Sequence, residues 1–164
     1  MDAARLYAEH QPALLRYLVR LTGDPDAAAD AAQEAFVRLL TRAPREDRLR
    51  AWLFTVATNV VRESANARKR RARLQDRFLG RAPVADPAPD PLAAAITGET
   101  RNRVRAALAA LSDRERTVLL MREEGFTHRE IADAVGTTTG SVGTMIARAL
   151  DKLAEHLPLD EEAP

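Results

Sequence analysis

The sequence of 164 residues contains no cysteine, which excludes disulfide bonds, thiolate metal sites and a thiol nucleophile. Its three histidines lie far apart in the chain, no pair of carboxylates has a spacing suited to acid–base catalysis, and no glycine-rich phosphate loop is present. No apolar run approaches the roughly 20 residues of a membrane-spanning helix, and the first residues do not resemble a signal peptide. We therefore expect a cytoplasmic protein without membrane insertion, metal, cofactor or enzymatic activity.

The sequence also has little net charge. The formal net charge is +1, so the charge of the whole chain does not indicate a nucleic-acid partner. The distribution of charge does, because residues 43–81 contain eleven basic and four acidic side chains while the rest of the chain is slightly acidic. Such a concentration of positive charge is typical of a segment that binds a polyanion.

Residues 49–73 carry most of this basic charge, and their pattern predicts a long amphipathic helix. Leu49, Trp52, Leu53 and Val56 follow one another at helical intervals and would form one buried face. Another side of the helix would present amide, hydroxyl and guanidinium groups, which suit contacts to base edges and phosphates. The candidate nucleic-acid contacts are Thr55, Asn59, Arg62, Asn66, Arg68, Lys69, Arg70, Arg71 and Arg73. The alternative is an ordinary solvated helix that ends in a run of charges.

Two further helices precede this segment and complete a predicted three-helix bundle. Apolar residues recur at helical intervals in residues 3–21, where we expect Pro12 to kink or split the helix. Gly23 can end that helix, and Asp24 is a suitable N-cap for a second helix at about residues 25–40, with a proline in its first position. The polar residues off the apolar face of this second helix are Asp30, Gln33 and Glu34. On their own they indicate nothing more than a solvated surface.

The composition changes in residues 75–99, which contain four prolines and two glycines and have no helical periodicity. This segment is predicted to be a flexible linker. We therefore expect an all-α protein of two small domains, with a helical bundle in residues 1–74, a second helical domain in residues 100–157, and a short tail in residues 158–164. A linker of this length would let the two domains contact separate places on one large partner.

The second domain contains the pattern of a helix-turn-helix motif. Two capping boxes, at residues 112–115 and 127–130, mark the starts of two helices, and Gly136 can end the second of them. A turn of three threonines then leads into a helix at about residues 140–153, and the apolar positions of the helices agree on one packing arrangement. We interpret this pattern as a DNA-binding motif, with an ordinary helical hairpin as the alternative.

In such a motif the second helix enters the major groove of DNA with its N-terminal residues near the bases. The residues in question are Thr139, Ser141, Gly143, Thr144 and Met145, followed one turn later by Arg148. This group carries little charge, although phosphate neutralisation supplies much of the affinity of DNA-binding proteins. We therefore expect the domain alone to bind DNA weakly, with Arg122, Arg129 and Arg148 as its main basic contacts.

The two domains together resemble the extracytoplasmic-function (ECF) sigma factors of bacterial RNA polymerase, within the sigma-70 superfamily. The matching segments are DAAQEAF at residues 30–36, WLFTVATNVVRE at residues 52–63 and LSDRERTVLLMREEGFTHREIADAVGTTTGSVGTMIARAL at residues 111–150. No single segment is specific to this family, but the order and spacing of the segments, with the linker between them, are specific when taken together. The resemblance covers essentially the whole chain.

The resemblance implies an alternative sigma factor that binds core RNA polymerase, directs it to −10 and −35 promoter elements and helps to open the DNA. Its first domain would bind the polymerase clamp helices through Asp30, Gln33 and Glu34. The helix with Asn59, Arg62 and Asn66 would meet the single-stranded −10 element, and the loop at residues 42–48 would capture a flipped base. The second domain would bind the −35 duplex through Arg122, Thr144 and Arg148. An anti-sigma factor is a further partner expected from the resemblance.

Several positions depart from the family pattern. Relatives usually carry basic residues where this chain has Gly143 and Met145, and often where it has Thr55, so we expect a weak or unusual −35 interaction that depends on backbone fit and DNA shape. In the loop, residues 43–45 replace a commoner aromatic pattern, which prevents a residue-by-residue assignment of the flipped-base pocket. The remaining alternative is a stand-alone helix-turn-helix regulator of duplex operators, but the sequence shows no ligand pocket or dimer seam.

Overall fold

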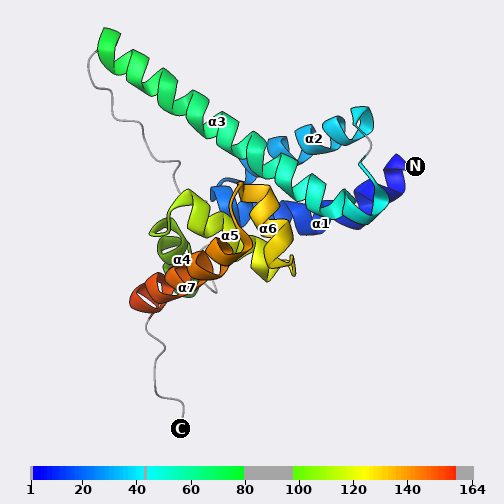
Figure 1. Cartoon of the computed structure of the whole chain (residues 1–164). Helices are drawn as coiled ribbons and strands as arrows, with labels where there is room; N and C mark the ends of the chain where they lie inside the picture. Colours follow the sequence, from blue (N-terminus) through cyan, green and yellow to red (C-terminus); the bar gives the residue numbers. More distant parts are fainter. Residues whose placement is uncertain (1, 43, 80–97, 158–164) are drawn as a thin grey trace.

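The computed structural model describes residues 2–42, 44–79 and 98–157, and the regular elements in these ranges are all helices (Figure 1). This confirms the predicted all-α fold. Ala43, most of the predicted linker and the predicted tail at residues 158–164 lie outside the described ranges. Among the helices of the described part, none is long and apolar enough to cross a membrane.

The N-terminal unit consists of α1 (Ala3–Thr22), α2 (Pro25–Thr41), the short 3-10 helix η1 (Glu46–Arg48) and α3 (Leu49–Leu79). The junction between α1 and α2 has the predicted caps. Gly23 has a φ of 69°, in the left-handed region that favours glycine, and its N–H donates to the Val19 carbonyl. The Asp24 carboxylate accepts N–H groups of the first turn of α2. These caps end one helix and start the next within two residues.

Two details of this unit differ from the sequence-based expectation. α1 is one continuous helix and is not split at Pro12, which lies on its exposed side while residues on either side of it hold the helix against the bundle. α3 extends to Leu79, five residues past the predicted end of the domain at residue 74. Residues 70–79 contain mostly good helix formers and no glycine or proline, so nothing ends the helix before Gly80.

The core of the N-terminal unit contains the predicted apolar faces and one polar pair that the sequence did not predict. The fully buried Tyr17 hydroxyl lies 2.7 Å from the Thr58 hydroxyl, which donates to the Phe54 carbonyl over 2.7 Å. Since the Thr58 proton is used in this way, Tyr17 is the donor of the pair. Burial raises the pKa of Tyr17, which keeps its hydroxyl neutral. Phe54 is fully buried, whereas Trp52 is half-buried at the edge of the core.

The C-terminal unit consists of α4 (Gly98–Ala109), α5 (Asp113–Glu123), α6 (His128–Val135) and α7 (Thr139–His156). Both predicted capping boxes are present, at the starts of α5 and α6. Gly136 has a φ of 68° and ends α6, and Thr138 caps α7 two residues later. α6, the short turn and α7 therefore form the predicted helix-turn-helix. Val104 of α4 is exposed although its side chain is apolar.

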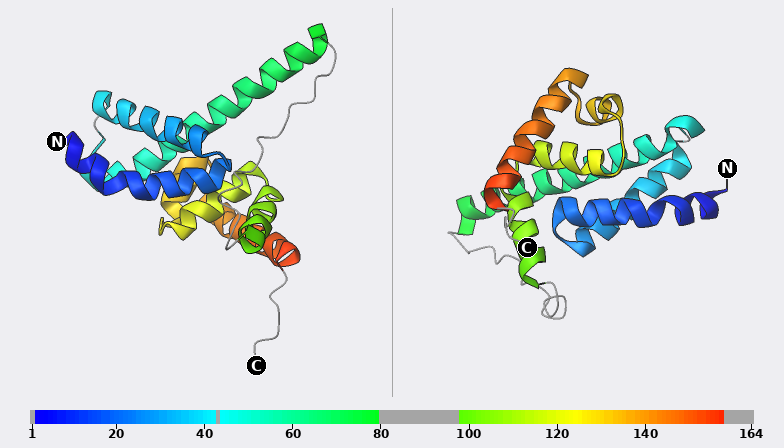
Figure 2. Two further views of the ribbon diagram at one scale, coloured as in Figure 1. Left: turned by 180° about the vertical axis from the view of Figure 1, so that it is seen from behind. Right: turned by 90° about the horizontal axis from the view of Figure 1, so that it is seen from below.

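The two units pack against each other. α6 lies along the first part of α3, and α5 lies next to α1 (Figures 1 and 2). A single cluster of buried apolar side chains runs from α1, α2 and α3 into α5, α6 and α7. A smaller cluster around Leu111 belongs to the C-terminal unit alone. The second half of α3 projects away from the other helices of both units (Figure 2).

Candidate nucleic-acid interface

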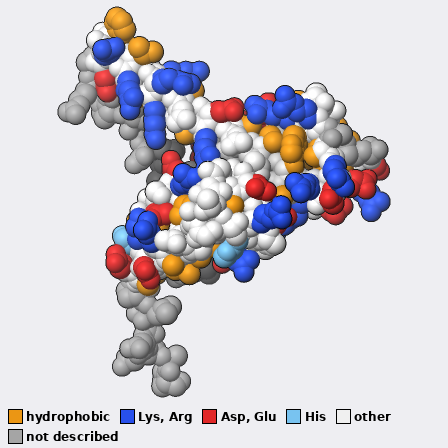
Figure 3. Space-filling view, viewed as in Figure 1, with side chains coloured by type: hydrophobic (Ala, Val, Ile, Leu, Met, Phe, Trp, Pro, Cys, Tyr) orange, Lys and Arg blue, Asp and Glu red, His pale blue; other side chains and the backbone are white. Residues whose placement is uncertain are grey.

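The candidate DNA contacts of α3 follow the helix from the bundle out to its projecting end. Thr55, Asn59 and Arg62 are half-buried within the bundle, and the Thr55 hydroxyl donates to the Ala51 carbonyl over 2.8 Å. The remaining candidates are exposed: Asn66, Arg68, Lys69, Arg70, Arg71 and Arg73. Lysine and arginine side chains therefore line the projecting part of α3 (Figure 3). This surface combines a few well-ordered polar groups with a dense set of exposed cations.

The candidate polymerase contacts lie on α2. Asp30 and Gln33 are exposed, while Glu34 is half-buried. The Glu34 carboxylate accepts a 2.8 Å hydrogen bond from Arg38, which also lies 3.5 Å from the Glu63 carboxylate of α3. The hydrogen bond to Glu34 raises the pKa of Arg38 above its ordinary value. Glu34 therefore helps to connect α2 with α3, whereas the side chains of Asp30 and Gln33 are exposed and accessible to a partner.

The α2 and α3 candidates meet at a groove of about 590 Å³. Asp30 and Glu34 line one side of it, and Arg68 and Arg71 line the other. Alanine side chains of both helices and two valines of α3 supply its apolar lining. The groove thus has an acidic wall, a basic wall and an apolar base, which suits a helix with apolar and charged faces.

Sequence reasoning missed two apolar residues on the same side of α2. Val37 is 49% exposed and Leu40 is 64% exposed. With Asp30 and Gln33 they form a stripe at steps of three and four residues, which places all four on one helix face. We call this stripe the α2 stripe. Its signal in the sequence is that Val37 and Leu40 lie off the apolar face that packs into the core.

The candidate contacts of the helix-turn-helix gather at the start of α7. Thr139, Thr144 and Arg148 are exposed. Ser141 is half-buried, and its hydroxyl lies 2.8 Å from that of Thr138, the N-cap of the helix. Gly143 is half-buried, and Met145 is half-buried because it packs against the main core cluster. Met145 thus has less surface for a partner than the residues beside it.

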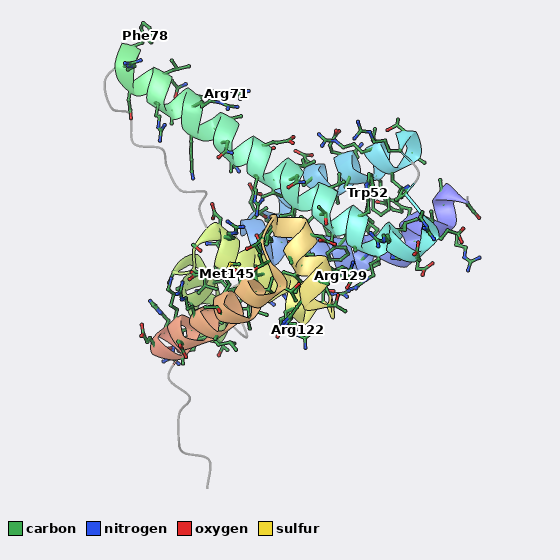
Figure 4. The ribbon with its side chains drawn as sticks, in the orientation of Figure 1. Trp52, Arg71, Phe78, Arg122, Arg129 and Met145 are labelled. Carbon is green, nitrogen blue, oxygen red and sulfur yellow. The ribbon has the colours of Figure 1, made fainter. Side chains whose placement is uncertain are left out.

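Two arginines add charge near this helix. Arg122 is exposed on α5 and donates a 3.2 Å hydrogen bond to the Phe126 carbonyl. Arg129 is exposed on α6 (Figure 4). All eight candidates of this group therefore lie on the C-terminal unit and are separate from the candidates on α2 and α3. The candidate residues thus form two candidate DNA-binding surfaces, one on each unit.

Comparison with known proteins identifies both units. Residues 6–72 match the family described as Sigma-70 region 2, and residues 101–153 match Sigma-70, region 4. The chain is 30% identical over 157 residues to the ECF RNA polymerase sigma factor EcfG of Rhodopseudomonas palustris, covering 91% of this chain and 81% of that protein. The chain belongs to the ECF sigma factors. It is an alternative sigma factor of transcription initiation, and the stand-alone regulator is not favoured.

One further relative and one solved structure are also similar to this chain. The ECF sigma factor SigG of Mycobacterium tuberculosis is 32% identical over 172 residues, and the match covers 88% of this sigma factor but 46% of SigG. The fold is similar to that of the sigma factor RpoE from Bartonella quintana, solved in complex with the anti-sigma factor NepR. That comparison has a TM-score of 0.76 and 22% identity, and it covers 98% of this chain and 99% of RpoE.

Proposed function

We propose that this sigma factor binds core RNA polymerase through the α2 stripe, the −10 element through α3 and the −35 element through α7. The observation that carries the proposal is the presence of two separate DNA-binding candidates, each on its own helical unit. A protein that reads two elements of one promoter requires such a division. The fold alone would leave the roles of the individual residues open.

At the −10 element, α3 would combine two kinds of contact. Asn59 and Arg62 are half-buried, so packing restricts their side chains before DNA binds, and Asn66 continues the same polar stripe. Ordered amide and guanidinium groups suit the edges of unpaired bases, whose unstacking costs a few kcal/mol. The exposed run of residues 68–71 would neutralise phosphates, and this adds affinity without sequence preference.

At the −35 element, α7 would enter the major groove with small and hydroxyl-bearing residues near the bases. Gly140 and Gly143 have no side chains that keep the helix backbone from the DNA. Arg122, Arg129 and Arg148 are the exposed cations of this group. We therefore propose a −35 interaction that depends on backbone fit and DNA shape and is weak for the isolated chain.

Core polymerase would bind the α2 stripe with a surface of complementary chemistry. Asp30 and Gln33 offer hydrogen-bond acceptors, and Val37 and Leu40 offer apolar area that is now exposed to water. A basic and apolar helical surface fits this combination. We also propose an anti-sigma factor as a partner that covers polymerase-binding surfaces of the free sigma factor, and a cytoplasmic location, where polymerase is found.

In vitro transcription tests this proposal. The purified chain is added to core polymerase that lacks any other specificity subunit, and transcripts are sequenced from a promoter library. We expect start sites that share a −10 and a −35 element. The variant Asn59→Ala should change the preferred bases of the −10 element and leave the −35 element unchanged. If no promoter is used, or if the preferred bases stay the same, the proposed roles are wrong.

A further inference from the structure

Two large apolar side chains lie exposed near the end of α3. Phe78 is 81% exposed and Leu74 is 53% exposed, and Phe78 is the most exposed of the large apolar side chains in the described ranges. It lies at the far end of the projecting part of the helix (Figure 4). The match to Sigma-70 region 2 ends at residue 72, before both residues. We call residues 73–78 the α3 tip, which the matched family region does not account for.

The apolar face of α3 continues into the tip beyond the helix that covers it. Val60, Ala67 and Leu74 follow one another at intervals of seven residues, which places them on nearly one line along the helix. Val60 and Ala67 line the groove between α2 and α3. Leu74 and Phe78 lie one turn apart on the same side, where the helices of the described ranges leave them exposed. The tip therefore presents an uncovered continuation of a face that is packed inside the bundle.

Arginines surround this apolar face. The helical neighbours of a residue lie three and four positions away, and those of Leu74 are Arg70, Arg71, Arg77 and Phe78. All three arginines are exposed. The acidic residue of the tip, Asp76, is two positions from both apolar residues and therefore lies nearly on the opposite side of the helix. One side of the tip thus combines apolar surface with cations and carries no anion.

A surface of this size and charge fits nucleic acid better than the other occupants of an exposed apolar face. A second copy of the chain would bring the same positive charge to the contact. A protein interface buries about 800 Å² on each partner, several times what two side chains supply. A membrane-surface helix needs an apolar face along its length, whereas residues 68–71 before the tip are all basic and exposed. A nucleotide has one flat base and one phosphate, which match an aromatic ring beside cations.

The polar stripe that we assign to the −10 element leads directly to the tip. Asn66, Arg70, Arg73 and Arg77 continue this stripe at steps of three and four residues. Phe78 follows Asn66 by 12 residues, which is about 18 Å of helix rise. This distance corresponds to about five nucleotides at B-form spacing, and to fewer in an extended strand. A strand that leaves the −10 contacts along α3 therefore reaches Phe78 within a few nucleotides.

We propose that the α3 tip is a further contact for single-stranded promoter DNA, in which Phe78 stacks on one unpaired base and the arginines around Leu74 bind the phosphates beside it. The inference rests on the proposed reading of the −10 element by α3 and extends the contact beyond Asn66. Stacking tolerates any base, because every base has a flat face. The tip therefore stabilises the opened DNA without specifying its sequence.

Equilibrium binding of the holoenzyme, formed from core polymerase and the full chain, to a promoter probe with a mismatched −10 region measures this contact. Phe78→Ala should weaken binding about tenfold, Phe78→Leu should weaken it similarly, and Phe78→Trp should retain it, because stacking requires an aromatic ring. Since Phe78 is so exposed, none of these changes should affect folding. The control Val104→Ala removes an exposed apolar side chain from α4 and should leave the affinity unchanged. Full affinity of either Phe78→Leu or Phe78→Ala would overturn the proposal.

Salt dependence separates the two parts of the contact. Phe78→Ala should leave the slope of log affinity against log salt concentration unchanged, whereas Arg77→Gln should reduce it by about 0.7, the value for one phosphate of a single strand. An unchanged slope for Arg77→Gln would overturn the phosphate contacts. Vesicles of phosphatidylserine and phosphatidylcholine test a membrane surface as the alternative, and we expect no cosedimentation of the chain with them. Cosedimentation that Phe78→Ala abolishes would assign the tip to lipid and overturn the DNA contact.

Photocrosslinking identifies the nucleotide beside the tip. A benzophenone derivative of phenylalanine replaces Phe78 in one variant and Asn66 in another, and crosslinks are mapped on the opened promoter in the holoenzyme. We expect both positions to reach unpaired nucleotides, no more than about five apart. If position 66 crosslinks to DNA while position 78 crosslinks only to protein, only to paired DNA or not at all, the tip contact is overturned. A crosslink from position 78 with none from position 66 would support the tip contact and contradict the proposed −10 reading instead.

Discussion

At the scale of single residues, Gly143 offers a test of how α7 reads DNA. Its Cβ position has no neighbour closer than 3.9 Å, and its φ is not in the left-handed region, so a side chain can be added without strain. We expect Gly143→Arg to tighten binding to a −35 duplex about tenfold, because one groove or phosphate contact is worth about 1–3 kcal/mol. The slope of log affinity against log salt concentration should also become steeper, by the amount expected for about one added phosphate contact.

The control for this variant is Gly143→Ala, which gains helix propensity but no charge. Fluorescence anisotropy with a labelled duplex measures both variants at several salt concentrations. Equal affinity of the arginine and alanine variants would mean that the start of α7 does not approach the phosphates or the groove.

Leu40 gives a second test at this scale, because its side chain is 64% exposed and contributes little to the core. Leu40→Ser should weaken binding to core polymerase about tenfold, as expected for the loss of one apolar side chain from an interface. The free energy of unfolding should change by less than about 0.5 kcal/mol. Leu150→Ser removes a similarly exposed leucine from α7 and should leave polymerase affinity unchanged. Competition binding and urea unfolding separate the two effects, and equal affinities of both variants would exclude Leu40 from the interface.

At the scale of elements, the projecting end of α3 should act through its charge. Replacing Arg70 and Arg71 with glutamine keeps good helix formers but removes two exposed cations. We expect weaker promoter binding by the holoenzyme for all sequences alike, with the slope of log K against log salt reduced by about 0.7–0.9 per lost contact. The pair Arg101→Gln and Arg103→Gln on α4 removes the same charge elsewhere. An equal loss of promoter affinity in both pairs would show that the arginines of α3 act only through the net charge of the protein.

The contact between α5 and α7 should make the C-terminal unit sensitive to acid. Lys152 donates to the Glu115 carboxylate over 2.8–2.9 Å, and together with the Ser112 N–H it holds the pKa of Glu115 below its ordinary value of 4.5. The folded state therefore prefers the ionised form. This contribution is fully present above about pH 4.5 and is lost as the pH falls through the lowered pKa.

We expect Glu115→Gln to be less stable than the natural chain near neutral pH and to approach it in stability as the pH falls below 4.5 and through the lowered pKa of Glu115. Urea unfolding at a series of pH values measures the difference between the two proteins. Other carboxylates titrate in both and cancel in this comparison. A difference that stays constant from neutral pH down to the pH at which both proteins unfold in acid would show that Lys152 does not favour the ionised form.

Local signals predicted most of these elements. The two capping boxes, the glycine ends of α1 and α6 and the helix-turn-helix spacing depend on residues a few positions apart, and such patterns can be recognised in one sequence. The end of α3 was predicted too early because residues 75–79 adjoin the proline-rich segment after Gly80 and were assigned to the linker. The α2 stripe was missed because only the polar residues off the apolar face of this helix were considered as candidate contacts.

At the scale of the whole molecule, the packing of the two units could not be predicted from the sequence. The Arg50 guanidinium lies over the Phe126 ring although the two residues are 76 residues apart, and no periodicity or motif relates them. The charge pattern indicated only that the first unit binds a polyanion. Each unit also has a complete local pattern of its own, so the sequence favoured two independent domains. The shared core cluster adds a contact between the two domains that the sequence did not predict.

The shared cluster predicts that damage in one unit is felt in the other. Phe126→Ala should destabilise the chain by about 3–5 kcal/mol, as large-to-small changes of buried aromatic residues do. Because Phe126 packs on Phe54, backbone amides of α3 near Phe54 should exchange hydrogen faster, although the mutation lies in the C-terminal unit. Leu111→Ala is the matched control, since Leu111 is equally buried but belongs to the small cluster confined to α4, α5 and α7.

Hydrogen exchange followed by mass spectrometry resolves the two cases peptide by peptide. Leu111→Ala should raise exchange in the C-terminal unit and leave α3 protected, because opening that cluster does not remove a neighbour of Phe54. Phe126→Ala should raise exchange on both sides of the contact. If α3 stays equally protected in both variants, the units unfold independently, and the buried rings between them do not couple their stabilities.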